Sequence, residues 1–148
     1  MFKKFLLLAS AGLMAIGPAV AAEKVKIGFV TTITTPAGVI GKDMVDAVNL
    51  AMEDIGGKMA GLDVELIVED DGFKPAIGKQ KTDKLVKQDK VQFVTGFIWS
   101  HVLLASQKSA LGAGKFLISS NAGPSQMAGK LCHKNFFSTS WQNDQTPM

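Results

Sequence analysis

Segments rich in β-branched residues alternate along this chain with segments that carry a helical pattern, and this alternation constrains the fold more than any other feature. Strands that alternate with helices are typical of βαβ units, in which the helices cross over a parallel sheet. The sequence therefore predicts an α/β fold with a mostly parallel sheet and helices on both faces. Strands are expected at residues 25–31, 62–69, 91–95 and 116–119, and helices at residues 41–55, 75–88 and 100–113.

The first predicted helix has the clearest pattern. Its apolar residues recur at intervals of three and four, which places them on one stripe. The Gly56–Gly57 pair is expected to end this helix, because glycine readily adopts the conformation that terminates helices. Asp43 and Asp46 are expected near its N-terminus, where the helix dipole favours negative charge. The stripe consists of Met44, Val48, Ala51, Met52 and Ile55.

The N-terminal residues predict a secretory signal peptide over residues 1–21. Two lysines precede an apolar stretch from Phe5 to Ile16, and small residues follow it. The apolar stretch is shorter than the ~20 residues that a membrane-spanning helix needs. We expect cleavage after Ala21 or Ala22 and an exported protein; a retained membrane anchor is the alternative.

Charge and cysteine content limit the classes of partner. The chain has 16 basic and 13 acidic residues, but Lys3 and Lys4 lie in the predicted signal peptide, so the remainder is nearly neutral. Every basic residue is lysine, whereas arginine is the residue that reads phosphates and bases with two parallel hydrogen bonds. Nucleic acid is therefore not an expected partner. Cys132 is the single cysteine, which predicts either a partner outside these residues or a buried, inert thiol.

Three loops follow predicted parallel strands, and the carboxyl ends of such strands form the ligand crevice of open α/β sheets. They are residues 32–41, 96–100 and 119–125. The glycines of the first loop match neither the spacing of a Rossmann fingerprint nor that of a phosphate-binding loop. Its threonines, Thr34 among them, and the N–H groups of the next helix suit an anion such as a carboxylate. A connection that binds no ligand is the alternative.

The second loop places Trp99 beside Ser100 at the start of a predicted helix. An exposed tryptophan favours an aromatic wall that faces a ligand, and Ser100 is by itself a good N-cap residue. Ser100 and His101 do not indicate a catalytic pair, because no G-x-S-x-G elbow and no orienting acid accompany them. We therefore expect no enzyme activity.

The remaining polar groups point to a small-molecule site without metal or cofactor. In the third loop, Asn121 and Gly123 can bring backbone groups close to a ligand, although a simple turn would have the same residues. Asp70 and Asp71 suit a turn before Gly72. The Cys132–His133 pair lacks the ligand spacing of a metal site.

These loops and their strands resemble the branched-chain amino acid (Leu/Ile/Val) binding group of the periplasmic solute-binding proteins of ABC importers. The matching segments are KIGFVTTITTPAGVIGKDMVDAVNLAMEDIGG, LDVELIVEDDGFKPAIGKQKTDKLV, VQFVTGFIWSHVLLA and FLISSNAGPSQM. The resemblance implies a type I binding protein with two α/β lobes that close on a ligand, of which this chain would be an N-terminal fragment. Residues 22–139 would form the first segment of the N-terminal lobe, and residues 140–148 would begin the crossover to a second lobe.

The resemblance also implies roles for individual residues. Ser100 matches the serine that binds the ligand carboxylate, and Asn121, Ala122 and Gly123 match the next contact loop. Gly123 departs from the hydroxylated residue that amino acid binders carry there. Ile40 departs from an aromatic residue of many relatives. Both departures weaken the case for an α-amino acid ligand.

We therefore expect the substrate-binding component of an ABC importer in the periplasm, acting as a monomer with a permease of the inner membrane. The ligand would be a small carboxylate, either a branched-chain amino acid or an aromatic acid. Trp99 and the segment SWQND at residues 140–144, similar to subgroups associated with aromatic acids, favour the second. A ligand-sensing receptor of the same fold and, less favoured, a small α/β hydrolase are the alternatives. The expected ligand-binding residues are Thr34, Trp99, Ser100, Asn121, Ala122 and Gly123.

Overall fold

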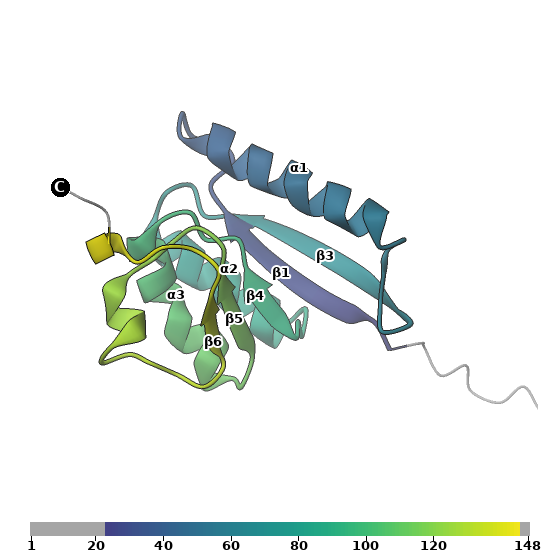
Figure 1. Ribbon diagram of the computed structural model, residues 1–148. Helices are drawn as coiled ribbons and strands as arrows, with labels where there is room; N and C mark the ends of the chain where they lie inside the picture. The colour runs from purple at the N-terminus through teal and green to yellow at the C-terminus, as the bar shows by residue number, and fades with distance from the viewer. Residues whose placement is uncertain (1–22, 146–148) are drawn as a thin grey trace, which may run out of the picture.

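A six-stranded sheet lies at the centre of residues 23–145, the part of the chain that the computed structural model describes (Figure 1). Its strands have the spatial order β2-β3-β1-β4-β5-β6; β2 pairs with β3 antiparallel, and all other neighbours are parallel. The predicted, mostly parallel sheet is therefore confirmed, whereas the predicted signal peptide lies outside the described residues. The strands are β1 (Val25–Thr31), β2 (Lys58–Met59), β3 (Leu62–Asp70), β4 (Phe93–Thr95), β5 (Phe116–Ser119) and β6 (Phe136–Ser138).

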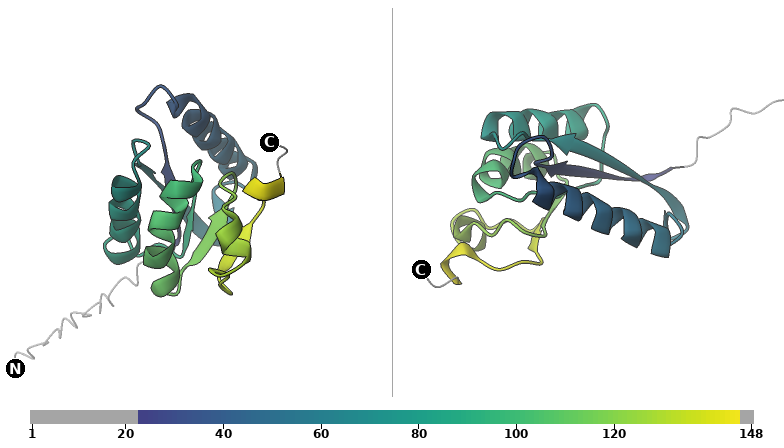
Figure 2. Two further views of the ribbon diagram at one scale, coloured as in Figure 1. Left: turned by 90° about the vertical axis from the view of Figure 1, so that its left-hand side faces the viewer. Right: turned by 90° about the horizontal axis from the view of Figure 1, so that it is seen from above.

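The helices lie on both faces of the sheet, as predicted. Helix α1 stands on one face, over β1 and β3, and α2 and α3 pack side by side on the other face (Figures 1 and 2). None of the helices between residues 23 and 145 has the length and hydrophobicity to cross a membrane. The helices are α1 (Gly38–Asp54), α2 (Pro75–Lys87) and α3 (Ser100–Gly112), with two short 3-10 helices, η1 (Ser125–Ala128) and η2 (Asn143–Gln145).

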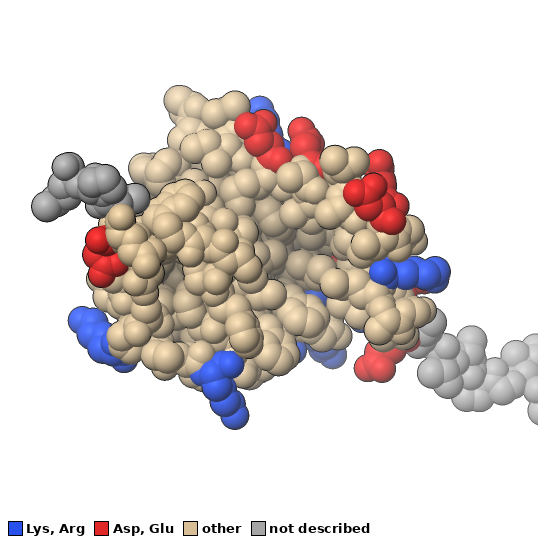
Figure 3. Space-filling view, in the orientation of Figure 1, with Lys and Arg blue, Asp and Glu red and all other residues tan. Residues whose placement is uncertain are grey.

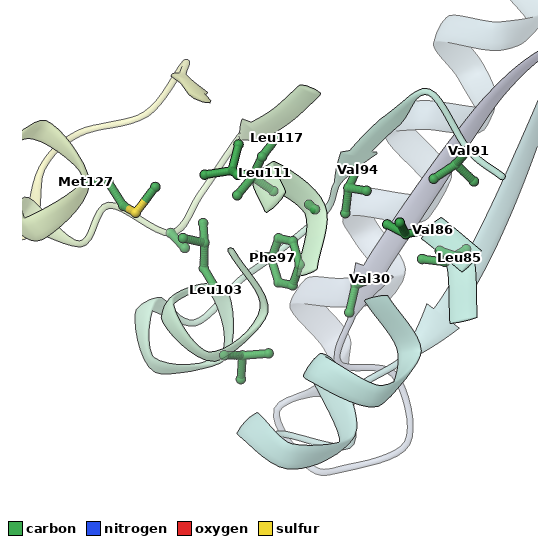
Figure 4. Close-up of a cluster of buried hydrophobic side chains, with 13 residues drawn as sticks. Val30, Leu85, Val86, Val91, Val94, Phe97, Leu103, Leu111, Leu117 and Met127 are labelled. Carbon is green, nitrogen blue, oxygen red and sulfur yellow. The ribbon is translucent and has the colours of Figure 1, made fainter. Parts of the chain in front are cut away.

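The face that α2 and α3 cover holds the hydrophobic core (Figure 4). Successive strand residues point to opposite faces of a sheet, and those on this side pack against the two helices. Gly28 lets α2 approach β1 closely, because a Cβ at this position would lie 2.9 Å from Cδ1 of Leu85. The fully buried members of this core include Val30, Leu85, Val94, Leu103 and Leu117.

The opposite face is only partly covered. Phe93, Phe116 and Phe137 form a row of rings across β4, β5 and β6, with centroid separations of 5.6 Å and 6.2 Å between neighbours. The exposed fraction is 41% for Phe116 and 51% for Phe137. Acidic side chains follow α1 in Figure 3, and the surface beside them carries few charges. An apolar surface therefore remains open next to α1.

Helix α1 begins at Gly38 rather than at the predicted Gly41. A Cβ at Gly38 would overlap the carbonyl oxygen of Ile33, and a Cβ at Gly41 would overlap that of Thr32. The first turn of α1 therefore packs directly on the backbone of the preceding loop, and only glycine permits this approach. The two glycines serve the contact between loop and helix.

The earlier start corrects the expectation for the helix dipole. The first turn of α1 contains no acidic residue, so Asp43 and Asp46 lie too far along the helix to interact with its N-terminus. The end of the helix is confirmed, because Gly56 and Gly57 follow it with φ values of 63° and 66°. Part of the predicted stripe is buried less than expected: Met44, Val48 and Met52 are half-buried, whereas Ala51 and Ile55 are exposed.

Three further features differ from the sequence-based expectations. Strands β2 and β6 were not predicted, because they are short and contain no β-branched residue. Cys132 is exposed and unpaired within the described residues, so the alternative of a buried thiol is wrong. The N-cap residue of α3 is Trp99, and Ser100 is the first residue of the helix. Within the described residues, no side chain caps the N-terminus of α3.

Candidate functional site at the carboxyl edge of the sheet

The carboxyl ends of β1, β4 and β5 lie at one edge of the sheet, as the parallel pairing requires. Phe29 of β1 lies opposite Thr95 of β4, and Val94 lies opposite Leu117 of β5. The loops that follow these strands therefore meet at the same edge. The structure thus brings the three loops together that the sequence singled out, and their contacts determine what each can offer a ligand.

Thr34 lies on the β3 side of this edge and is held by Asp70. Its hydroxyl donates to Oδ2 of Asp70 over 2.5 Å, and the N–H of Ile33 donates to Oδ1 over 2.9 Å. Burial would raise the pKa of Asp70, but the hydrogen bonds from Thr34, from the N–H of Gly72 and from Ile33 outweigh it and hold this pKa below its usual value. Because its proton is directed to Asp70, the Thr34 hydroxyl offers an incoming ligand only lone pairs.

Trp99 ends the loop after β4, and its indole contacts the loop after β1. Its indole Nε1–H donates to Oγ1 of Thr32 over 3.0 Å. The Phe73 ring meets the indole edge-on with a centroid separation of 4.8 Å, and the His101 ring lies 5.2 Å from that of Phe73. Trp99, Phe73 and His101 thus form an aromatic cluster at the edge of the sheet.

Sequence reasoning identified Trp99 but missed Phe73. A signal was present, because Phe73 is a large aromatic residue between the turn at Gly72 and the helix that begins at Pro75. Its side chain is 45% exposed. The same argument from exposed aromatic surface that singled out Trp99 applies to it.

Ser100, at the start of α3, has its hydroxyl in contact with Asn143. Nδ2 of Asn143 donates to Oγ of Ser100 over 3.0 Å, and Oδ1 of the same carboxamide lies 3.4 Å from that oxygen. A carboxamide has the planar, two-headed shape of a carboxylate. The Ser100 hydroxyl is therefore accessible to a group of this shape at the edge of the sheet.

The loop after β5 is fixed to the loop after β4. Nδ2 of Asn121 donates to the carbonyl oxygen of Ile98 over 3.0 Å, and the N–H of Ala122 donates to that of Phe97 over 3.1 Å. Ala122 is only 2% exposed. These two predicted site residues therefore bind the loop after β4. They place Gly123 at the part of the edge where Ser100 lies.

Gly123 is buried beneath the C-terminal part of the described chain. Its carbonyl oxygen accepts a hydrogen bond of 2.7 Å from the N–H of Asn143, and a Cβ at position 123 would overlap the carbonyl oxygen of Trp141. Close approach of the segment 141–143 thus explains why glycine, rather than a hydroxylated residue, stands here. The same segment covers both Ser100 and Gly123.

An apolar hollow of about 230 Å³ adjoins the loop after β5. Its walls include Phe29 of β1, Asn121, and Ile40, Met44 and Val48 of α1. It lies on the α1 face, so the edge combines polar groups at Ser100 with apolar surface on either side. Within residues 23–145, no three His, Cys, Asp or Glu side chains form a cluster that could hold a metal ion.

Comparison with known proteins agrees with this arrangement. A family model described as periplasmic binding protein matches residues 24–148. An ABC transporter substrate-binding protein from Sphaerobacter thermophilus is 29% identical, with a TM-score of 0.78 over 83% of this chain and 34% of its own. No curated protein matches the chain.

Two further solved structures contain a ligand. A solute binding protein of an ABC transporter from R. palustris, in complex with benzoate, is 27% identical, with a TM-score of 0.79 over 83% of this chain and 34% of its own. The branched-chain amino acid transporter substrate binding protein LivJ from Streptococcus pneumoniae, in complex with isoleucine, is 26% identical, with a TM-score of 0.74 over 81% and 34%.

The chain spans about a third of the length of these structures. Its mostly parallel sheet with helices on both faces matches the lobe of a type I periplasmic binding protein. The family match covers nearly all of the described residues. The chain belongs to the periplasmic binding protein family.

Proposed function

We propose that this protein is the solute-binding component of an ABC importer and that the carboxyl edge of its sheet binds a small carboxylate. The family and the similar ABC transporter proteins support the transport role. The contact that supports the ligand class is the one in which the Ser100 hydroxyl donates to Oδ1 of the planar Asn143 carboxamide over 3.4 Å, as it would donate to a carboxylate oxygen. A ligand carboxylate would take the place of that carboxamide when the segment 141–143 moves away from the edge.

Ser100 and the N-terminus of α3 would hold the acid group of the ligand. A serine hydroxyl can donate to a carboxylate, and the N-terminal end of a helix favours negative charge. The backbone N–H of Gly123, in the loop after β5, would donate a further hydrogen bond to the acid group. Thr34 would not hold the acid group, because its proton is directed to Asp70; its lone pairs could accept a hydrogen bond only from a donor group elsewhere on a ligand.

The apolar part of the ligand would lie against aromatic surface. Trp99 is held at the same edge, and its ring is joined by that of Phe73. Flat aromatic rings stack well on such a wall, so we propose an aromatic acid in preference to a branched-chain amino acid. The bound benzoate of the R. palustris protein and the bound isoleucine of the S. pneumoniae protein define the two candidates to compare.

Titration of the isotope-labelled chain with benzoate and with isoleucine, followed by amide NMR, tests the proposal. NMR detects weak binding, which is expected if one lobe carries only part of the contacts. The amide signals of Ser100 and Gly123 should move with benzoate. Ser100→Ala should weaken the affinity roughly tenfold, because a hydrogen bond to a charged group is lost.

Ser109→Ala is the matched control. Ser109 lies on α3, as Ser100 does, but its side chain is next to Asp83 of α2 and away from the edge of the sheet. It should leave the affinity unchanged. Shifts confined to residues away from the edge, or equal effects of the two substitutions, would contradict the proposed site. Uptake of the same acid should be lost in cells that lack the protein; unchanged uptake would contradict the transport role.

A further inference from the structure

Asp71 is a fully buried acidic residue that the proposed binding chemistry does not use. Its side chain is 0% exposed and lies between the sheet and helices α2 and α3. A Cβ at Gly78 of α2 would be 3.5 Å both from Cβ of Asp71 and from Oγ of Ser106 of α3. Burial of a carboxyl group is unfavourable unless specific hydrogen bonds compensate it. The groups that donate hydrogen bonds to Asp71 therefore indicate why a carboxyl group is buried here.

Both hydrogen-bond partners of the Asp71 side chain found in the described chain bind the same oxygen. The hydroxyl of Thr32 donates to Oδ1 over 2.5 Å, and the N–H of Phe73 donates to Oδ1 over 2.8 Å. Each of them leads to one ring of the aromatic cluster. Thr32 accepts the indole N–H of Trp99, and Phe73 carries the ring that meets this indole edge-on.

The direction of the hydrogen bonds follows from the chemistry of the groups. An indole N–H only donates, so Thr32 is the acceptor for Trp99, and a threonine hydroxyl has one proton and two lone pairs. The proton of Thr32 must therefore point to Asp71, which leaves a lone pair for Trp99. Without Asp71 the hydroxyl could rotate and lose its preference for the indole.

Phe73 gives a second, separate link from Asp71 to the cluster. Its φ value is 65°, a left-handed conformation that is unusual for a bulky residue. The hydrogen bond from its N–H to Asp71 helps to hold this conformation, which directs the ring against Trp99. One buried oxygen atom thus fixes both rings.

We propose that Asp71 is a positioning residue that, through Thr32 and Phe73, fixes the Trp99 indole and thereby makes the edge select flat aromatic acids over aliphatic ones. The selectivity rests on the proposed function, since it requires that a carboxylate binds beside Trp99. The fixed orientation of the indole does not depend on a ligand. The two parts can therefore be measured separately.

Proton–nitrogen NMR of the indole groups tests the positioning role directly, because the chain has only two tryptophans, Trp99 and Trp141. Trp141→Phe assigns the two indole signals. In Thr32→Val the Trp99 indole N–H should shift upfield and exchange with water roughly tenfold faster, because its acceptor is lost. The Trp141 signal should stay in place and serves as an internal reference. Thr32→Ser should restore the wild-type signal.

Thr31→Val is the matched control. Thr31 is also a fully buried threonine of the same segment, but its Oγ1 has no hydrogen-bond partner in the described chain. Its replacement should leave the Trp99 indole unchanged. Equal exchange rates of the Trp99 indole in Thr32→Val and wild type would overturn the positioning role. If Thr32→Val does not fold, Asp71→Leu, which removes the acceptor oxygen at a similar side-chain size, should still accelerate the exchange; an unchanged rate there would also overturn it.

Titration with benzoate and with isoleucine tests the selectivity. The ratio of the two affinities should fall at least threefold in Thr32→Val, with benzoate losing the most, while Thr31→Val keeps the wild-type ratio. An unchanged ratio in a variant with a displaced indole would overturn the selectivity. If the wild-type chain binds neither acid while the indole of Thr32→Val is displaced, the proposed function and the selectivity fail together, and the positioning role stands.

Discussion

The two faces of the sheet are built from similar residues but are packed very differently. On the α2–α3 side, Leu85, Val94 and Leu103 are completely buried, whereas Phe116 and Phe137 on the α1 side keep 41% and 51% of their surface exposed. Parallel strands usually have both faces covered. The difference shows that apolar composition alone does not make a core. The fold of this chain depends on the face where two helices meet the sheet.

Truncation of one large side chain on each face tests this comparison most directly. Leu103→Ala should lower the free energy of unfolding by about 3 kcal/mol, because it removes buried apolar surface and leaves a cavity. Phe116→Ala should lower it by less than about 1 kcal/mol, although the side chain is larger, because it is already partly exposed. Urea denaturation of both variants gives the two values. Equal losses would show that the α1 face is packed as firmly as the other.

A pair of glycines on the same side of the sheet sharpens the comparison. A Cβ at Gly78 would overlap Cγ1 of Val102 where α2 crosses α3, whereas a Cβ at Gly112 would meet no atom within 4 Å. Gly78→Ala should therefore destabilise the fold by about 1–3 kcal/mol. Gly112→Ala should stabilise it by up to about 1 kcal/mol, because alanine favours the helix more than glycine does.

Thermal unfolding followed by circular dichroism measures both changes. The melting temperature should fall for Gly78→Ala and rise or stay the same for Gly112→Ala. A fall of similar size in both variants would mean that loss of glycine as such, and not the contact between α2 and α3, determines the effect.

The sequence predicted the elements whose pattern is local. Runs of apolar and β-branched residues located β1 and β5 to the residue, and Pro75 located the start of α2. The meeting of three loops at one edge also followed from the sequence, because parallel strands align their carboxyl ends. Such features depend on local pattern and on general rules of topology.

Features that depend on distant contacts could not be predicted. Asp70 and Asp71 look alike in the sequence, yet Asp70 holds Thr34 at the surface, and Asp71 is buried and holds Thr32. Each of these contacts joins residues more than thirty positions apart. Gly38 is similar, because the reason for its small size is the backbone of Ile33, which is near it only after α1 has packed on the loop.

The smallest expected effect on the free energy of unfolding comes from the exposed charged residues of α2 and α1. On α2, Asp83 lies between Lys79 and Lys87, with nitrogen–oxygen distances of 2.7 Å and 3.1 Å. Hydrogen bonds from Lys79 and then from Lys87 lower the pKa of Asp83 to about 2. On α1, by contrast, the acidic residues Asp43 and Asp46 face solvent.

Asp83→Asn should therefore reduce the free energy of unfolding at pH 7 by about 0.5 kcal/mol, within the range of exposed ion pairs. A lowered pKa in the folded state stabilises the fold above the unfolded pKa of 3.8 and loses this effect as the pH falls towards 2. The difference between wild type and variant should accordingly shrink from pH 4 to pH 2. It should also shrink in 1 M salt, because salt screens exposed charges. Urea denaturation of wild type and variant across this pH range measures the difference, and Asp46→Asn on α1 is the control. A difference in the free energy of unfolding that does not change with pH would show that the ion pairs of Asp83 stabilise the fold no more than the exposed Asp46 does.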